Sequence, residues 1–292
     1  MKPAPFEYLA PTTVDEAVAH LAKHGWDAKV LAGGQSLVPL MNFRLSQPSV
    51  IVDLNRVSEL FYIRLDGDGS LRLGAMTRQC DVERDPLVAE HAPLVHETMP
   101  NIAYPQIRSR GTFGGSIAHA DPAAELAAVS LALDARFRLR SHAGERWVEA
   151  SDFFVGLFST VLEPDELLVE VALPSMPPRC GWSFMEVTRR HHDFAMAGVA
   201  ALVVVDSSGR CERARLAFLS VGDGPVNAHQ AAEALVGQSP TPETISAAAD
   251  TAASSDIDPG SDIHASAEYR RHLTRVLGRR ALTQAFDRAR GG

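Results

Sequence analysis

The sequence predicts an α+β protein with a larger amino-terminal domain and a smaller carboxy-terminal domain. A helical pattern between apolar runs opens the chain, alternating strands dominate its middle, and an Ala-rich helical tail follows a last group of strands. The 292 residues exceed one typical domain, so one large domain with a smaller one is the expected arrangement. With 46% hydrophobic and 22% charged residues, the composition is typical of a globular chain with a sizeable core.

Charge and hydropathy narrow the classes of partner. The net charge of −8 disfavours a nucleic-acid or anionic-membrane surface, which would need clustered Lys and Arg. No apolar run approaches the roughly 18 residues of a membrane-spanning helix, and the first residues carry no apolar signal region. We therefore expect a cytoplasmic protein that binds neither nucleic acid nor membrane.

Cysteine and histidine spacing predicts no metal site. Cys80, Cys180 and Cys211 are isolated, so no zinc or iron–sulfur spacing is present. The eleven histidines form no H-E-x-x-H motif. We expect no metal bound by this chain.

The first 55 residues predict a βαβ unit. Thr13 and Glu16 have capping-box spacing and Gly25 stands where a helix would end, so we expect a helix over about residues 14–24. The run AKVLAGG predicts a short strand that leads into two glycines. A short helix or turn at SLVPLMNFRL and a buried strand at SVIVDL follow.

Antiparallel strands are expected beyond this unit. FYIRLDGDGSLRLGAM predicts two strands around a Gly-Asp-Gly turn, helices follow around QCDVERDPLVAEHAPLVHETM, and RFRLRS, RWVEA and LLVEVALP predict further strands. The proline-rich LPSMPPRCG is the best linker. Strands at FMEVTR, AGVAALVVVD and RARLAFLSVG precede a helical tail over about residues 226–290. We expect domains at 1–176, with subdomains of about 1–55 and 56–176, and at 177–292, where a three-stranded antiparallel sheet carries helices.

Two glycine-rich loops stand out as candidate binding elements. LAGGQSLVPLMNFRL (31–45) and GTFGGSIAHADPAAEL (111–126) both place Gly-Gly before a small hydroxyl residue, about 80 residues apart. Each loop could simply make a tight turn. Together they predict two groups of exposed backbone N–H that close on one diphosphate, with Ser36, Thr112 and Ser116 adding hydroxyl donors. Neither loop has the G-x-G-x-x-G or G-x-x-x-x-G-K-[ST] pattern of the usual nucleotide folds.

The same stretches resemble a known family. AGGQSLVPLMNFRL and IRSRGTFGGSIAHADPAAEL, in this order, are similar to the two FAD-binding signatures of the medium, flavoprotein subunit of molybdenum hydroxylases. That family includes the medium subunit of carbon monoxide dehydrogenase and the flavin region of xanthine dehydrogenase. FMEVTRRHHDFAMAGVA resembles its C-terminal domain. The resemblance implies FAD as cofactor and a two-subdomain FAD-binding domain of the vanillyl-alcohol oxidase and p-cresol methylhydroxylase type.

The resemblance also implies residue roles. Glu125 falls near the adenosine end, Asp193 and Phe194 approach the isoalloxazine from the second domain, and Met185 replaces a Lys of xanthine dehydrogenase relatives. Without the resemblance, Asp121 and Glu125 could equally be helix-start charges, and Phe194 would be a core residue. The implied cofactor contacts are Ala32, Gly33, Gly34, Gln35, Ser36, Leu37, Ile102, Thr112, Phe113, Gly114, Gly115, Ser116, Ala118, Asp121, Glu125, Leu167, Leu168, Met185, Asp193 and Phe194.

The implied function is electron transfer in a complex. The resemblance names a small 2Fe–2S subunit and a large molybdopterin subunit as partners, assembled as a dimer of heterotrimers, and an external electron acceptor. No catalytic nucleophile or acid–base pair is expected in this chain. Two alternatives stay open: a self-contained FAD oxidoreductase of the same fold, and a non-redox binding module that has lost FAD. A basic rim of Arg108, Arg110, Arg189 and Arg190 is also possible, although such clusters are often only solvated or paired with carboxylates.

Overall fold

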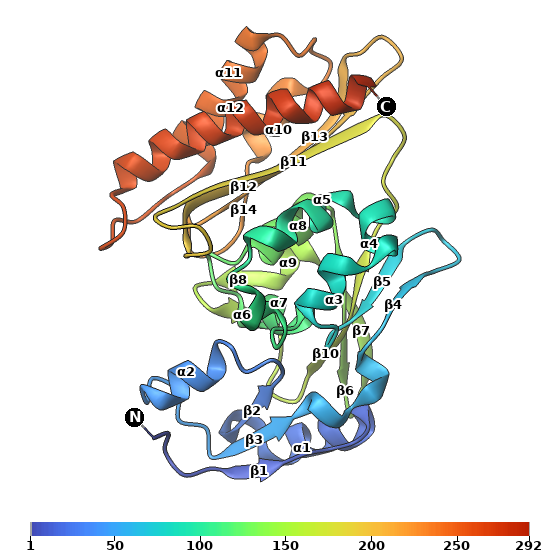
Figure 1. The fold of residues 1–292 in the computed structure, drawn as a ribbon, viewed down its shortest axis with the longest axis vertical. Helices are drawn as coiled ribbons and strands as arrows, with labels where there is room; N and C mark the ends of the chain where they lie inside the picture. The colour runs from blue at the N-terminus through green and yellow to red at the C-terminus, as the bar shows by residue number, and fades with distance from the viewer. Residues whose placement is uncertain (1, 292) are drawn as a thin grey trace.

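A computed structural model describes residues 2–291, and they form the mixed helix and sheet fold that the sequence predicts. Figure 1 shows three parts stacked along the long axis: the blue amino-terminal unit, the green and cyan middle, and the orange and red carboxy-terminal part. Among the described residues, no helix is long and apolar enough to cross a membrane.

The amino-terminal unit is a three-stranded parallel sheet with the order β1-β3-β2. Its helix α1 begins after Thr13, whose hydroxyl accepts from Glu16 N at 3.2 Å. The Glu16 carboxylate accepts from Thr12 N at 2.7 Å instead of Thr13 N, so only half of the predicted capping box forms. Strand β1 was not predicted, because a three-residue edge strand carries too little alternation to be recognised. The unit consists of β1 (Glu7–Leu9), α1 (Val14–His24), β2 (Ala28–Leu31), α2 (Leu37–Asn42) and β3 (Val50–Asp53).

The middle part is a five-stranded antiparallel sheet, β4-β5-β10-β6-β7, covered on one face by helices. Leu73, Phe137 and Val171 of the sheet share one core with Val95 and Val129 of the helices. All predicted strands of this part are present. The elements are β4 (Ile63–Leu65), β5 (Leu71–Gly74), α3 (Gln79–Arg84), α4 (Pro86–His91), α5 (Pro93–Thr98), α6 (Pro105–Arg108), α7 (Phe113–His119), α8 (Glu125–Ala132), β6 (Arg136–Ser141), β7 (Gly144–Glu149), α9 (Ala150–Phe153), β8 (Phe154–Gly156), β9 (Ser159–Thr160) and β10 (Leu167–Leu173).

The carboxy-terminal part is an antiparallel sheet, β11-β12-β13-β14, with helices on its outer face. Three strands were predicted, and the structure adds the two-residue β14, which pairs with β13. Gly181 lets α12 approach β11, because a Cβ there would lie 2.6 Å from Ala289 N. The elements are β11 (Cys180–Thr188), β12 (Ala195–Val205), β13 (Cys211–Leu219), β14 (Val226–Asn227), α10 (His229–Leu235), α11 (Pro242–Thr251) and α12 (Ala267–Gly291). Short 3₁₀ turns lie at Gly25–Asp27, Leu54–Arg56, Ser58–Leu60 and Met99–Asn101, and a π-helical turn at Ala252–Asp256.

One carboxylate joins the middle and carboxy-terminal parts. Glu97 of α5 accepts from Phe184 N at 3.0 Å and from Arg288 Nη1 at 2.6 Å. Arg288 of α12 also donates to Trp182 O at 2.7 Å. A second link runs from Ser220 N to Pro122 O at 2.8 Å. These bonds fix the last sheet over α5 and α8.

Candidate functional site

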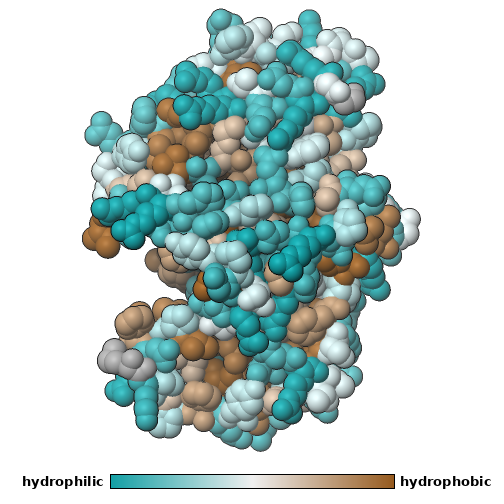
Figure 2. All heavy atoms as spheres, in the orientation of Figure 1, coloured by the Kyte–Doolittle hydropathy of each residue, from teal (hydrophilic) through white to brown (hydrophobic). Residues whose placement is uncertain are grey.

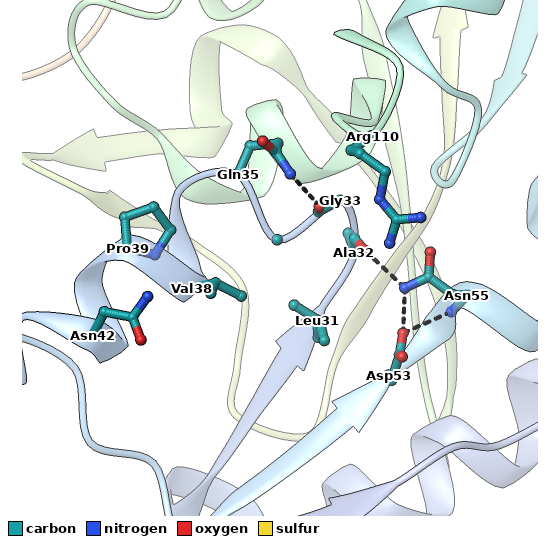
Figure 3. A pocket seen from close by; sticks show the side chains of 11 residues that line it. Leu31, Ala32, Gly33, Gln35, Val38, Pro39, Asn42, Asp53, Asn55 and Arg110 are labelled. Carbon is teal, nitrogen blue, oxygen red and sulfur yellow. Dashed lines mark hydrogen bonds between the residues drawn. The ribbon is translucent and has the colours of Figure 1, made fainter. Parts of the chain in front are cut away.

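The first glycine loop lines a cleft of about 350 Å³. It connects the end of β2 to the start of α2, and Figure 3 shows it curving past Asn55 and Arg110. Figure 2 shows the molecule hollowed on the side where α2 lies in Figure 1. The lining residues are Leu31, Ala32, Gly33, Gly34, Gln35, Val38, Pro39, Asn42, Asp53, Asn55 and Arg110.

The first loop has unused backbone donors. Among residues 2–291, the N–H groups of Gly33, Gly34, Gln35 and Ser36 donate to no protein acceptor. The Gln35 side chain instead donates to Gly33 O at 3.0 Å and holds the loop in shape. Gly34 has φ of +75°, a conformation that only glycine adopts without strain. Because exposed N–H groups that converge make a concave site for anions, this loop fits a phosphate group.

The second loop is different from the expectation of a matching group of free N–H. Phe113 N donates to Thr77 O at 3.0 Å and Gly114 N to Ala75 O at 2.9 Å. Thr112 is the N-cap of α7 and its hydroxyl accepts from Gly115 N at 3.0 Å. These donors are therefore already used, because the loop closes onto the neighbouring strand and caps its own helix. What it still offers a ligand is the Ser116 hydroxyl.

The two glycine loops lie directly against each other. A Cβ on Gly33 would lie 2.7 Å from Gly111 Cα, and a Cβ on Gly115 would lie 3.2 Å from Ala32 Cβ. At both glycines a Cβ would collide with other protein atoms, so the absence of side chains here is what allows the two loops to pack against each other.

Asn55 and Arg78, which the sequence reading missed, tie the loops together. Asn55 Nδ2 donates to Ala32 O at 3.0 Å, and Arg78 Nη2 donates to Asn55 Oδ1 at 2.5 Å. Arg78 Nη1 also donates to Arg110 O, directly ahead of the second loop. Burial lowers the pKa of Arg78 from its ordinary value. No motif marks either residue, since they lie outside the glycine-rich stretches.

Three predicted apolar contacts lie in cores. Ile102 and Leu168 belong to the large core of the middle part, and Leu167, on the opposite face of β10, belongs to the core shared with the amino-terminal unit. Of the remaining residues, Phe113 is fully buried, Leu37 is half-buried at the start of α2, and Ala118 is exposed on α7. Asp121 accepts from Ala123 N at 2.9 Å and so shapes the turn before α8.

Asp193 and Phe194 lie in the connection between β11 and β12 of the carboxy-terminal part. The connection between β11 and β12 lies on the same side as α2 and α7 (Figure 1). The ring centroids of His192 in this connection and of Tyr104, which follows Ile102, are 5.0 Å apart. The Phe194 side chain is 75% exposed, so it is free to cover a ligand rather than being a core residue.

Two expectations need correction: the cofactor contact at Met185 and the place of Arg108 in a basic rim. Met185 packs with Val187 against the core under α12, so its side chain points away from the first domain. Arg108 belongs to no basic rim: it is 5% exposed, donates to Glu83 Oε2 at 2.8 Å and to Ile102 O at 2.8 Å, and so anchors the turn at Ile102. Arg110 does line the cleft.

Glu186 is a further candidate that the sequence reading missed. It neighbours Met185 on β11, and alternation turns it toward the first domain. Burial, with a contribution from the Glu125 carboxylate, raises the pKa of Glu186 to about 8, and burial raises the pKa of Glu125 to about 7. The Glu125 carboxyl is therefore near enough to Glu186 of the carboxy-terminal part to influence its pKa. No sequence motif marks Glu186. The one signal for it is strand alternation, because Glu186 stands two residues after Phe184 and so points to the same face of the sheet.

The chain matches two families over nearly its whole length. Residues 4–176 match the family described as "FAD binding domain in molybdopterin dehydrogenase", and residues 182–285 match "CO dehydrogenase flavoprotein C-terminal domain". No group of three or more His, Cys, Asp or Glu side chains that could hold a metal ion occurs in the described residues.

Named relatives are similar from end to end. The chain is 43% identical to 6-hydroxypseudooxynicotine dehydrogenase complex subunit alpha of Paenarthrobacter nicotinovorans, covering 99% of this chain and 97% of that one. It is 39% identical to caffeine dehydrogenase subunit beta of Pseudomonas sp. strain CBB1, with the same coverage. A solved chain of carbon monoxide dehydrogenase from Hydrogenophaga pseudoflava superimposes with a TM-score of 0.95 at 40% identity, covering 99% of both chains. The chain therefore belongs to the FAD-binding medium subunits of the molybdenum hydroxylase family, and it is an FAD-carrying component of an oxidoreductase.

Proposed function

We propose that this chain is the electron outlet of a molybdenum hydroxylase complex. It holds FAD between the 2Fe–2S clusters of a small partner subunit and an external electron acceptor, while substrate is oxidised at the molybdopterin site of a large partner subunit. When bound, FAD supplies one- and two-electron redox chemistry, for which the protein provides position and electrostatic environment. The single observation that carries the proposal is the contact of the two glycine loops beside a cleft with four unused N–H donors.

The residues of the chain bind and orient the cofactor. The N–H groups of Gly33, Gly34, Gln35 and Ser36 would donate to the pyrophosphate, and Ser116 would add a hydroxyl donor. Asn55 and Arg78 keep the two loops in contact. Arg110 adds positive charge at the cleft, which favours a dianionic ligand. Phe194 would cover the isoalloxazine from the second domain.

The names of the relatives support a role within a larger complex. One is named as subunit alpha of a dehydrogenase complex, one as subunit beta, and others as medium chains. Their named substrates differ although each is similar to this chain over nearly its full length. This is consistent with a substrate site on another subunit. We place the chain in a cytoplasmic dimer of heterotrimers, since oligomers are commonly arranged about a two-fold axis.

Co-purification tests this proposal. The chain is expressed with an affinity tag, alone and together with the genes encoded beside it. We expect the co-expressed sample to elute as one species that contains three different chains, FAD, iron and molybdenum. A tagged chain that carries FAD but elutes alone from the co-expressed sample would contradict the role in a complex, and one without FAD would contradict the cofactor site itself.

A further inference from the structure

The hairpin of β8 and β9 has an exposed apolar tip. Between the paired residues Phe154 and Thr160, the side chains of Val155, Leu157 and Phe158 are 59%, 58% and 54% exposed. These three residues, called the hairpin tip below, are separated only by a glycine. A cluster of large apolar side chains in solvent typically marks a surface that another protein covers.

The composition around the hairpin tip is that of an interface core. Residues 153–162, FFVGLFSTVL, contain no Asp, Glu, Lys or Arg. Asp152 and Glu163 stand directly on either side of this stretch, and both are exposed. The centre of a protein–protein interface is typically aromatic and depleted of charge, whereas its rim is polar. The hairpin tip with its two flanking carboxylates therefore fits an apolar socket that is rimmed by Lys or Arg side chains.

The base of the hairpin is fixed in the core of the middle part. Phe153 and Phe137 are fully buried, with ring centroids 4.6 Å apart. The ring of Phe154 packs edge-on against these two rings, with centroids 5.2 and 6.1 Å away. Val161 N donates to Phe153 O at 3.0 Å and closes the base. Because the base is held in this way, the tip is presented in a fixed position and loses little conformational freedom on binding.

The hairpin tip also lies beside the proposed cofactor site. The ring centroid of Phe158 is 5.2 Å from that of His119, the last residue of α7. Helix α7 begins at the second glycine loop and carries Ser116 one turn before His119. Figure 1 shows β8 near α7, on the side of the molecule where α2 lies. A protein that covers the tip therefore also lies close to the cofactor.

This location selects one partner subunit. Electron transfer through protein falls off steeply with distance, so the subunit that donates electrons to FAD must lie against the cofactor site. The subunit that oxidises the substrate has no such requirement, because its electrons travel through the clusters. A small diffusible acceptor would need an open approach rather than a preformed apolar surface.

We propose that the hairpin tip of Val155, Leu157 and Phe158 is a docking site for the iron–sulfur partner subunit. The tip inserts into an apolar socket of that subunit, and Asp152 and Glu163 face basic side chains at the rim of the socket. This inference rests on the proposed function, since it takes the identity of the electron donor from it.

Photo-crosslinking in the assembled complex identifies the occupant. The photoreactive amino acid p-benzoylphenylalanine is introduced in place of Leu157 in the full chain, which is co-expressed with the genes encoded beside it. After irradiation, mass spectrometry identifies the cross-linked chain. We expect the iron–sulfur subunit. A cross-link to the molybdopterin subunit or to a second copy of this chain, or no cross-link in an assembled complex, would overturn the proposal.

Leu157→Glu tests the same surface without a probe. A charge in the apolar tip should reduce the amount of iron–sulfur subunit recovered with the tagged chain roughly tenfold, the effect of a residue central to an interface. The FAD content should stay at the wild-type level, because Leu157 does not line the cleft at the first glycine loop. Near-ultraviolet circular dichroism reports whether the variant is folded.

Val236→Glu is the matched control, because Val236 is exposed after α10 in the carboxy-terminal part. It introduces the same charge and should recover the iron–sulfur subunit as the wild type does. If Leu157→Glu recovers as much of that subunit as Val236→Glu, the docking site is wrong while the role in a complex stands. A wild-type chain that holds FAD but recovers no partner subunit would instead overturn the proposed function, and this inference with it.

Discussion

Gly33 of the first loop packs directly against Gly111 at the start of the second: a Cβ on Gly33 would lie 2.7 Å from the Gly111 Cα. Real Cβ atoms essentially never come this close to a backbone atom. The contact joins segments about 80 residues apart in the chain. The contact between the two loops therefore depends on the absence of a side chain at Gly33.

Gly33→Ala should separate the loops. The methyl group must displace the backbone of Arg110 and Gly111, which we expect to cost roughly 1–3 kcal/mol of stability, as overpacking usually does. FAD binding should weaken by more, because the donors of the first loop move away from the second loop. Urea unfolding and flavin fluorescence measure the two effects. Gly67→Ala is the control, since a Cβ there meets no atom within 4 Å, and equal behaviour of the two variants would argue against the contact.

Arg78→Met should loosen the same contact between the loops. It removes the bonds from Arg78 to Asn55 Oδ1 and to Arg110 O. We expect a loss of roughly 1–3 kcal/mol in the free energy of FAD binding, the usual worth of hydrogen bonds from a charged group. Isothermal titration with FAD measures it. Arg84→Met, at an exposed position of α3, is the control and should bind FAD as the wild type does. If Arg78→Met also binds FAD with the wild-type affinity, Arg78 does not support the site.

The domain junction should be sensitive to Glu97. Glu97→Ala leaves Phe184 N without its acceptor and Arg288 without its carboxylate partner. An expected loss of about 1–3 kcal/mol in the free energy of unfolding follows from these unsatisfied groups. Chemical denaturation of Glu97→Ala beside Glu268→Ala, an exposed position on α12, provides the comparison. A stability equal to that of Glu268→Ala would show that the junction does not depend on this carboxylate.

Stability should fall as pH rises, because of the two buried acids. In the unfolded chain Glu125 and Glu186 ionise near the ordinary value of 4.5, whereas in the folded chain their pKa values are about 7 and about 8. Between pH 4.5 and 8 the unfolded state has therefore lost protons that the folded state keeps, so the free energy of unfolding decreases through this window and levels off above it. Glu186→Gln should melt like the wild type at about pH 4.5 and at a higher temperature at about pH 9. If the wild type and Glu186→Gln melt at the same temperature at both pH values, this assignment is wrong.

The elements of the fold were predictable where the sequence carries local signals. Helix α1 begins and ends where Thr13 and Gly25 predicted it, and the three long strands of the second domain follow their apolar runs. Strand β1 and strand β14 were missed, since each is defined by its partner strand rather than by its own two or three residues. The sequence motifs located both glycine loops but not the hydrogen bonds that the second loop already makes.

The site residues show the same division. Gly33, Gly34 and Gly115 could be predicted as candidates because glycine-rich loops can be recognised in the sequence. Asn55, Arg78 and Glu186 were missed, because only the packing of distant segments brings them to the loops or to Glu125. Met185 was expected near the cofactor but packs under α12, because the face to which a strand residue points is fixed by the pairing register of the strand.

Turnover by the isolated chain tests the central claim most directly. The chain loaded with FAD is mixed with small organic compounds, including those that the complex of all three subunits is found to oxidise, and reduction of the flavin absorbance is followed by stopped flow. If the chain is an electron outlet, its flavin stays oxidised with these compounds when the chain is alone, and it is reduced within the complex only after the iron–sulfur clusters. An isolated chain that oxidises such a compound at ordinary enzyme rates, roughly 1 to 1000 per second, would contradict the role as an electron-transfer subunit and make it a self-contained flavoenzyme.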